Sequence, residues 1–130
     1  MKKLLILIIL LGFFVTGCSN AEKESNLVQV EFITTNEVKK IIDNYQEYSD
    51  TVIIDVRSEV EYNSGHLKEA INIPLPNIES IDIDKDKKVI VYCRSGSRSK
   101  TASVKLKELG YDKVYDMGGV EDWEHELVEE

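Results

Sequence analysis

The sequence is short of cysteine and of positive charge. Two cysteines among 130 residues are too few for a disulfide-rich scaffold or for a zinc site with four cysteine ligands. Sixteen lysines and arginines are outnumbered by 24 aspartates and glutamates, giving a formal charge of −8. A general nucleic-acid binder needs a basic face, so we expect no nucleic-acid partner. The length allows one domain, and 42% hydrophobic residues is too much for a disordered chain.

The chain also lacks an apolar run long enough for a transmembrane helix. Two lysines precede an apolar run from Leu4 to Val15, which Gly12 alone interrupts. A spanning helix needs about 20 residues, and this run is much shorter. A basic start, a short apolar run and small residues behind it are typical of a secretory signal. A buried N-terminal helix is the alternative, but the run has no amphipathic spacing.

The end of this run, Val15-Thr16-Gly17-Cys18, resembles the lipobox of bacterial lipoproteins. In that family the peptide is cleaved before the cysteine, which then carries acyl chains such as palmitate. The resemblance implies a signal peptide at residues 1–17, lipidation of Cys18 and a location on the extracytoplasmic face of the cell membrane. Each buried acyl CH₂ contributes about 0.8 kcal/mol, so several chains hold the protein firmly. Ordinary secretion with a free Cys18 is the alternative.

The rest of the chain divides into a tether and one domain. Residues 18–30 are predicted to comprise the lipidated cysteine and a polar, flexible tether. In the domain at 31–130, strands are predicted at 32–33, 52–56, 70–73, 89–92 and 114–115. Helices are predicted at 34–45, 58–62, from about 98 to 109, and in an acidic segment holding Trp123 and Leu127, and Gly118-Gly119 is predicted to form a turn. This alternation predicts an α/β fold, with about five strands in a mainly parallel sheet flanked by helices.

Cys93 directly follows a predicted buried strand and opens a loop before a helix. The loop is Cys93-Arg94-Ser95-Gly96-Ser97-Arg98, and Ser99 follows it. Ligands of open α/β sheets bind outside the carboxyl ends of the strands. There the loop amides and the helix N-terminus supply partial positive charge to an anion. We therefore expect the pKa of Cys93 to fall from about 8.5 toward 7 or below.

Basic residues gather in the same segment. From Val89 to Lys107 there is no acidic residue, and five basic ones occur: Arg94, Arg98, Lys100, Lys105 and Lys107. A solvated helix face accounts for Lys105 and Lys107, but poorly for the two arginines. Free cysteine is often only a small buried hydrophobe, which is the alternative for Cys93. Its place beside arginine, serine and glycine favours a reactive thiol.

Many short motifs, in order, resemble those of a rhodanese domain. The first half carries Asp55-Val56-Arg57, Glu61-Tyr62, Gly65-His66 and Ala70-Ile71-Asn72-Ile73-Pro74. The second half carries Tyr92 to Ser99, Gly110-Tyr111, Val114-Tyr115 and Gly118-Gly119-Val120 with Trp123. The resemblance covers about residues 32–127 and implies a rhodanese-like fold.

The resemblance implies a sulfurtransferase that moves sulfane sulfur. Cys93 attacks a donor such as thiosulfate, a polysulfide or another persulfide, and holds the sulfur as Cys93–S–S⁻ until a thiol or cyanide-like acceptor removes it. Loop residues Arg94, Ser95, Gly96, Ser97, Arg98 and Ser99 stabilise that charge, and the two arginines attract an oxyanion donor. We expect no metal and no organic cofactor, because the cysteine carries the group, and we expect a monomer.

Two further residues are expected to support the site. Asp55 and Arg57 follow the second strand, and the resemblance suggests a buried Asp–Arg–Glu network with Glu61 that shapes the site. A structural role is favoured for this network, because buried charges need partners. His66 is also interpreted as structural.

Other functions remain open at this point. One is a non-catalytic rhodanese-like module that senses persulfides or binds a partner, since a fold alone does not establish activity. Another is a cysteine phosphatase or arsenate reductase, whose cradle is Cys-x₅-Arg, whereas this one is Cys-x₄-Arg. Thiol–disulfide redox chemistry has no resolving cysteine within the chain unless Cys18 stays free.

Overall fold

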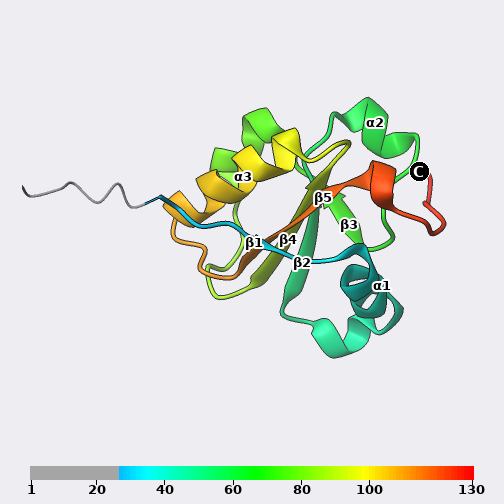
Figure 1. Ribbon diagram of the computed structural model, residues 1–130, viewed down its shortest axis with the longest axis horizontal. Coiled ribbons are helices and arrows are strands. Elements are labelled where there is room, and N and C mark those ends of the chain that lie inside the picture. Colours follow the sequence, from blue (N-terminus) through cyan, green and yellow to red (C-terminus); the bar gives the residue numbers. More distant parts are fainter. Residues whose placement is uncertain (1–26) are drawn as a thin grey trace, which may run out of the picture.

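A five-stranded, all-parallel sheet forms the centre of the computed structural model, which describes residues 27–130 (Figure 1). The strands are β1 (Glu31–Phe32), β2 (Thr51–Asp55), β3 (Ala70–Asn72), β4 (Lys88–Cys93) and β5 (Val114–Gly119). Their order in the sheet is β1-β5-β4-β2-β3. The predicted α/β fold is confirmed, and every strand pair is parallel.

Within residues 27–130, three α-helices and two 3₁₀ segments connect the strands, and a third 3₁₀ segment follows β5. The helices are α1 (Thr35–Asp43), α2 (Glu59–Asn63) and α3 (Ser97–Glu108), and the 3₁₀ segments are η1 (Tyr45–Tyr48), η2 (Leu75–Ser80) and η3 (Val120–Asp122). No helix in residues 27–130 is long and apolar enough to cross a membrane. The predicted signal peptide and Cys18 lie outside the described residues.

Capping boxes set the start of two helices, as their sequences predicted. The Thr34 hydroxyl accepts from the Glu37 amide, and the Glu37 carboxylate accepts from the Thr34 amide at 2.9 Å. Ser58 and Glu61 form the same reciprocal pair at α2, with the Ser58 amide 3.0 Å from the Glu61 carboxylate. Each box satisfies backbone donors that would otherwise have no partner.

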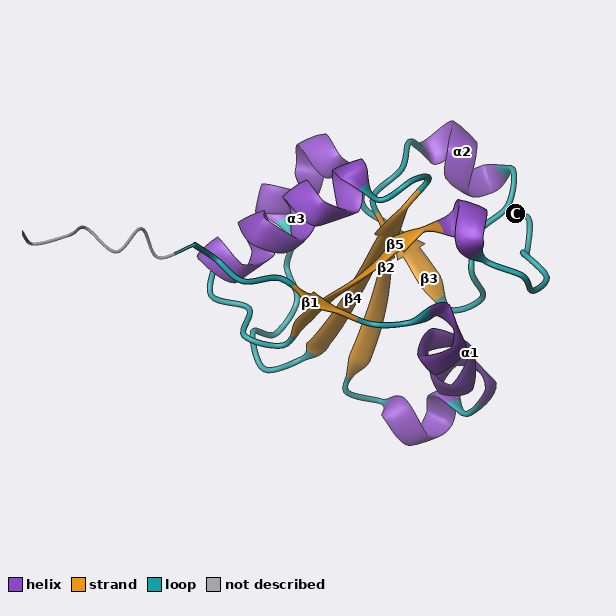
Figure 2. Ribbon diagram, in the orientation of Figure 1, coloured by secondary structure: helices purple, strands orange, loops and turns teal. Residues whose placement is uncertain are grey.

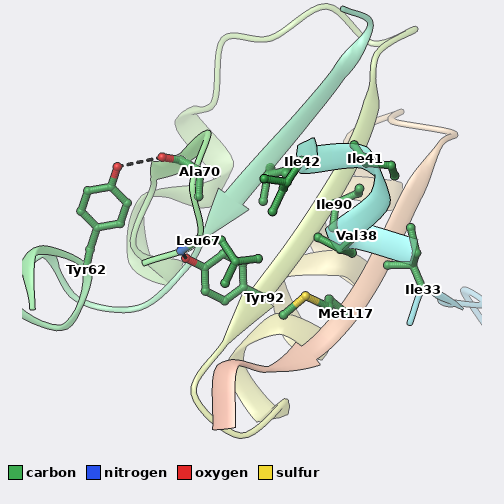
Figure 3. Close-up of a cluster of buried hydrophobic side chains, with 11 residues drawn as sticks. Ile33, Val38, Ile41, Ile42, Tyr62, Leu67, Ala70, Ile90, Tyr92 and Met117 are labelled. Carbon is green, nitrogen blue, oxygen red and sulfur yellow. Dashed lines mark hydrogen bonds between the residues drawn. The ribbon is translucent and has the colours of Figure 1, made fainter. Parts of the chain in front are cut away.

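The sheet is buried on both faces by two separate apolar clusters. Neighbouring strand residues alternate between them, so that Ile53 of β2 faces α1 and Ile54 faces α3. Figure 2 shows these helices on opposite sides of the sheet. The α1 cluster, drawn in Figure 3, gathers Val38, Ile41, Ile42, Leu67, Ile90, Tyr92 and Met117, among others. Burying each large apolar side chain contributes about 1.5–3 kcal/mol, and this fixes the strand register behind the loop that carries Cys93.

Two predictions for the end of the chain are wrong. Gly118 and Gly119, expected as a turn, are the last residues of β5. The acidic helix expected around Trp123 and Leu127 is absent: a single 3₁₀ turn, η3, is followed by irregular chain. The reason is a long-range pairing, because Val128 and His66 exchange both backbone hydrogen bonds at 2.9 Å. This antiparallel bridge holds the tail extended.

The end of β5 packs directly against the loop after β4. Gly119 is the register partner of Cys93, and a Cβ at Gly119 would lie 2.3 Å from the Arg94 carbonyl oxygen and 2.8 Å from the Ser95 Cα. Both neighbours are backbone atoms, which cannot rotate away. Only glycine allows this close approach.

We predict that Gly119→Ala displaces the loop, whereas Gly118→Ala does not. Gly118 has φ +88° and open space where its Cβ would be, so alanine there costs only backbone strain, about 1–2 kcal/mol. Urea unfolding should show both variants destabilised. Alkylation of Cys93 by iodoacetamide should slow several-fold in Gly119→Ala alone. If Cys93 in Gly119→Ala were alkylated at the wild-type rate, the close packing of β5 against the loop would be contradicted.

Candidate active site

Cys93 is the last residue of β4, and its side chain is 1% exposed. The Gly96 amide donates a hydrogen bond to its Sγ at 3.0 Å, and the Ser99 Oγ lies 3.5 Å from the same sulfur. Ser99 is itself fully buried and donates to the Gly96 carbonyl at 3.1 Å. The sulfur therefore lies within a ring of donors built by the loop and the first turn of α3.

Gly96 makes this turn possible. Its φ is +104°, in the left-handed region that favours glycine, and α3 begins at the next residue. The turn points the Gly96 amide at the sulfur and places the N-terminus of a 12-residue helix beside it. Partial positive charge from the helix end favours an anion there.

The environment of Cys93 acts on its pKa in two opposing ways. Burial raises the pKa of the thiol, while hydrogen bonds from Ser99, Gly96 and Ser95 lower it, and the net shift is downward. A buried thiolate is stable only when donors replace the water it has lost. The loop therefore favours the nucleophilic form of the cysteine.

Both arginines of the loop are paired with glutamates. Arg94, 69% exposed, donates from Nε to the Glu121 carboxylate at 3.1 Å. Arg98 donates from both terminal nitrogens to Glu61, at 2.8 and 2.9 Å. The Arg98 guanidinium lowers the pKa of Glu61 far below its ordinary value. The remaining loop serines, Ser95 and Ser97, are exposed.

The expected Asp–Arg–Glu network is wrong about Glu61. Arg57 donates to the fully buried Asp55 from Nε at 3.0 Å and from a terminal nitrogen at 2.7 Å, and to the Gly65 carbonyl at 2.6 Å. Glu61 is not part of this network, because its position in the first turn of α2 directs its carboxylate to Arg98. Asp55 and Arg57 thus form a separate buried pair.

That pair is a structural support of the site. Removing one partner of a buried ion pair typically lowers the free energy of unfolding by about 3–5 kcal/mol, since it leaves an uncompensated charge. The Asn72 amide donates to the backbone carbonyls of Asp55 and Arg57, both at 3.0 Å, and so ties β3 to the same corner. His66 is buried, stacks on Tyr62 at 3.7 Å and contacts the Tyr62 carbonyl through Nδ1 at 2.9 Å. These contacts give His66 a structural role.

Two residues at the site were missed by the sequence reasoning. Glu121 lies 27 residues from Arg94, and no spacing rule connects them. Asp116 is buried and accepts from the Gly118 amide at 2.8 Å, at the point where the pairing of β5 with β4 shifts register. Arg94 and Glu121 follow the ends of β4 and β5, which are neighbours in the sheet, so only the tertiary structure brings these two residues together. No cluster of three or more metal-ligating side chains occurs in residues 27–130.

Comparison with known families gives one match that covers most of the chain. The model of the rhodanese-like domain matches residues 34–126. Among curated proteins, the tRNA uridine(34) hydroxylase of Enterobacter sp. (strain 638) is 36% identical over 97 residues, which cover 68% of this chain and 27% of that protein. The enzyme of the same name from Escherichia coli O1:K1 / APEC is 33% identical over 109 residues, covering 77% and 30%. The chain spans less than a third of the length of these relatives.

The similar solved structures include chains that this domain covers almost completely, unlike the curated relatives. A rhodanese-like domain protein from Staphylococcus aureus is 29% identical with a TM-score of 0.67, covering 78% of this chain and 99% of that one. A rhodanese with anions from E. coli is 36% identical with a TM-score of 0.57, covering 62% and 99%. A protein from Rhodopseudomonas palustris, described as a possible tyrosine phosphatase, is 27% identical with a TM-score of 0.60, covering 72% and 79%. With its family match extending over residues 34–126, this chain belongs to the rhodanese-like domain family.

Proposed function

We propose that the protein is a sulfurtransferase whose Cys93 carries sulfane sulfur as a persulfide. The observation that carries this proposal is the set of polar groups around the sulfur: the Gly96 amide donates to it at 3.0 Å, and the Ser99 hydroxyl, 3.5 Å away, accepts from the thiol and can turn to donate to a thiolate. Donors fixed in this way stabilise a thiolate before the reaction and a terminal sulfur anion after it.

The reaction has two steps in which the cysteine is first loaded and then unloaded. The Cys93 thiolate attacks the outer sulfur of thiosulfate, the S–S bond of the donor breaks, and sulfite leaves with the bonding electron pair. A thiolate or cyanide then attacks the terminal sulfur of Cys93–S–S⁻, giving a new persulfide or thiocyanate and the original thiolate. Sulfur moves between nucleophiles throughout, so no cofactor is required.

Phosphatase chemistry fits this loop less well. A phosphate monoester needs a free guanidinium and a larger ring of amides at the cysteine. Here the cradle is one residue shorter than Cys-x₅-Arg, and Glu61 already engages both terminal nitrogens of Arg98. Release of phosphate from an aryl phosphate, without sulfur transfer, would favour the phosphatase.

The activity named for the curated relatives is not carried over to this chain. They are called tRNA uridine(34) hydroxylases, and the chain spans less than a third of their length. A formal charge of −8 also disfavours binding of a polyanion such as tRNA. A non-catalytic persulfide sensor of the same fold is the stronger alternative, and turnover distinguishes it from an enzyme.

We also propose that the protein acts at the extracytoplasmic face of the membrane, anchored by lipid on Cys18. The basic start, the apolar run and the sequence Val15-Thr16-Gly17-Cys18 support this, although they lie outside the described residues. The residues 19–26 then separate the anchor from the first described residue, Leu27, and allow the domain to stand off the bilayer.

The first prediction concerns sulfur transfer itself. Thiosulfate should add about 32 Da, the mass of one sulfur atom, to the purified protein, and cyanide should remove it as thiocyanate. Cys93→Ser should abolish the adduct and the turnover. The matched control is Cys18→Ser, which changes the other cysteine and should leave both intact. Thiocyanate production that survives Cys93→Ser would defeat the mechanism.

The second prediction concerns the pH dependence of the thiolate. The rate of alkylation by iodoacetamide follows the thiolate fraction. Because the pKa of Cys93 is lowered, the pH at which this rate is half-maximal should lie below that of a free cysteine, which is about 8.5. Ser99→Ala removes the hydroxyl beside the sulfur and should move this midpoint to higher pH. Ser103→Ala is the control, since Ser103 is equally buried on α3 but bonds to the Ser99 carbonyl. Equal midpoints in all three proteins would refute the role of Ser99.

The third prediction concerns the anchor. In cells, the wild-type protein should be found in the membrane fraction, and Cys18→Ser should not acquire lipid. Mass spectrometry of the N-terminal peptide should show acyl chains on Cys18 of the wild type, with residues 1–17 removed. An unmodified, cleaved Cys18 in the medium would show ordinary secretion instead.

A further inference from the structure

All three arginines of the chain lie at this edge of the sheet, and each is paired with a carboxylate. Arg57 is held by Asp55, Arg98 by Glu61 and Arg94 by Glu121. The sequence predicts that Arg94 and Arg98 attract an oxyanion donor. The positive charge of the three arginines is instead largely cancelled by the three acids, and the Cys93 thiolate itself adds a negative charge.

The pair at Arg94 differs from the other two. Arg57 is buried, and Arg98 is only 36% exposed, whereas Arg94 and Glu121 are 69% and 54% exposed. Arg94 is thus the loop arginine most open to an arriving donor. The charge that Arg94 presents to that donor depends on its pairing with Glu121.

The backbone keeps Glu121 beside Arg94. The Glu121 amide donates to the Arg94 carbonyl at 3.2 Å, in addition to the side-chain ion pair at 3.1 Å. An exposed ion pair is weak in water and opens readily. Because the backbone bond anchors Glu121 independently, its carboxylate stays near Arg94 even when the ion pair opens. A donor must therefore meet both charges together.

We propose that Glu121 is a specificity-determining residue, which masks Arg94 and so disfavours dianionic sulfur donors relative to organic persulfides. The inference rests on the proposed sulfur transfer at Cys93. Thiosulfate carries two negative charges toward a site that offers little net positive charge. An organic persulfide places no oxyanion group beside its reacting sulfur, so the amide donors of the loop suffice to bind it.

The loading step with such a donor is balanced without another reactant. The Cys93 thiolate attacks the outer sulfur of R–S–SH, the S–S bond of the donor breaks, and R–S⁻ leaves with the electron pair. The proton of the transferred sulfur passes to R–S⁻, which leaves Cys93–S–S⁻ and a thiol. No net oxidation or reduction occurs.

Charged and neutral alkylating reagents test the masking without requiring sulfur transfer. Iodoacetate and iodoacetamide react with the same thiolate and differ by one negative charge, so the ratio of their rates cancels any change in thiolate fraction. Glu121→Gln should raise the iodoacetate-to-iodoacetamide ratio at Cys93 by about three-fold at low salt, and less at high salt. Glu124→Gln is the control: it removes an equal charge from an exposed residue of the same tail.

Sulfur donors of different charge then test the specificity. Methanethiosulfonate, a monoanion, and thiosulfate, a dianion, both lose their outer sulfur to a thiolate. Glu121→Gln should raise kcat/KM for thiosulfate relative to methanethiosulfonate by a similar factor, and Glu124→Gln should leave that quotient at the wild-type value.

The two measurements separate failure of this inference from failure of the proposed function. An unchanged alkylation ratio in Glu121→Gln, or an equal rise in Glu124→Gln, overturns the masking role. A shifted alkylation ratio with no sulfur transfer from any donor supports the masking but overturns the specificity and the sulfurtransferase together. Active transfer with an unchanged donor quotient overturns the specificity alone.

Discussion

The convergence of hydrogen-bond donors on the Cys93 sulfur is the interaction on which the rest of the site depends. Removing a thiol from water disfavours its charged form, and Cys93 is almost completely buried. Hydrogen bonds with Gly96, Ser99 and Ser95 offset that effect, because the turn at Gly96 brings these groups to one atom. This geometry in turn requires β5 to end against the loop, where Gly119 leaves no room for a side chain. A small displacement of the loop would leave the thiol buried and neutral.

Local sequence patterns predicted most of the fold, because local interactions determine those elements. β-Branched runs gave the central strands, and capping boxes gave the starts of α1 and α2 within a residue. The place of Cys93 at a strand end followed from the same patterns. The acidic tail was mispredicted because its conformation depends on His66, 62 residues before Val128, and no local signal competes with that pairing.

The charge pairs of the site escaped prediction for a related reason. The sequence from Val89 to Lys107 contains no acidic residue and predicts a basic patch at the site. The acids that neutralise it come from other parts of the chain: Glu61 is 37 residues before Arg98, and Glu121 is 27 residues after Arg94. Once the parallel sheet brings the carboxyl ends of its strands together, the net charge at the site depends on loops that are distant in sequence.

Glu61 and Glu121 hold their arginines by different means, and this gives the loop one fixed side and one adjustable side. Glu61 also caps α2, accepting from the Ser58 amide and hydroxyl at 3.0 and 2.9 Å. These contacts hold its carboxylate in place independently of Arg98. Any change at Glu61 therefore disturbs a helix as well as a charge. The Glu121 side chain caps no helix and pairs with Arg94. Its backbone amide still donates to the Arg94 carbonyl when the side chain is changed. The Arg98–Glu61 pair on the α2 side is consequently fixed by the fold. On the β5 side, a substitution of Glu121 can change the charge near Cys93 without disturbing the backbone.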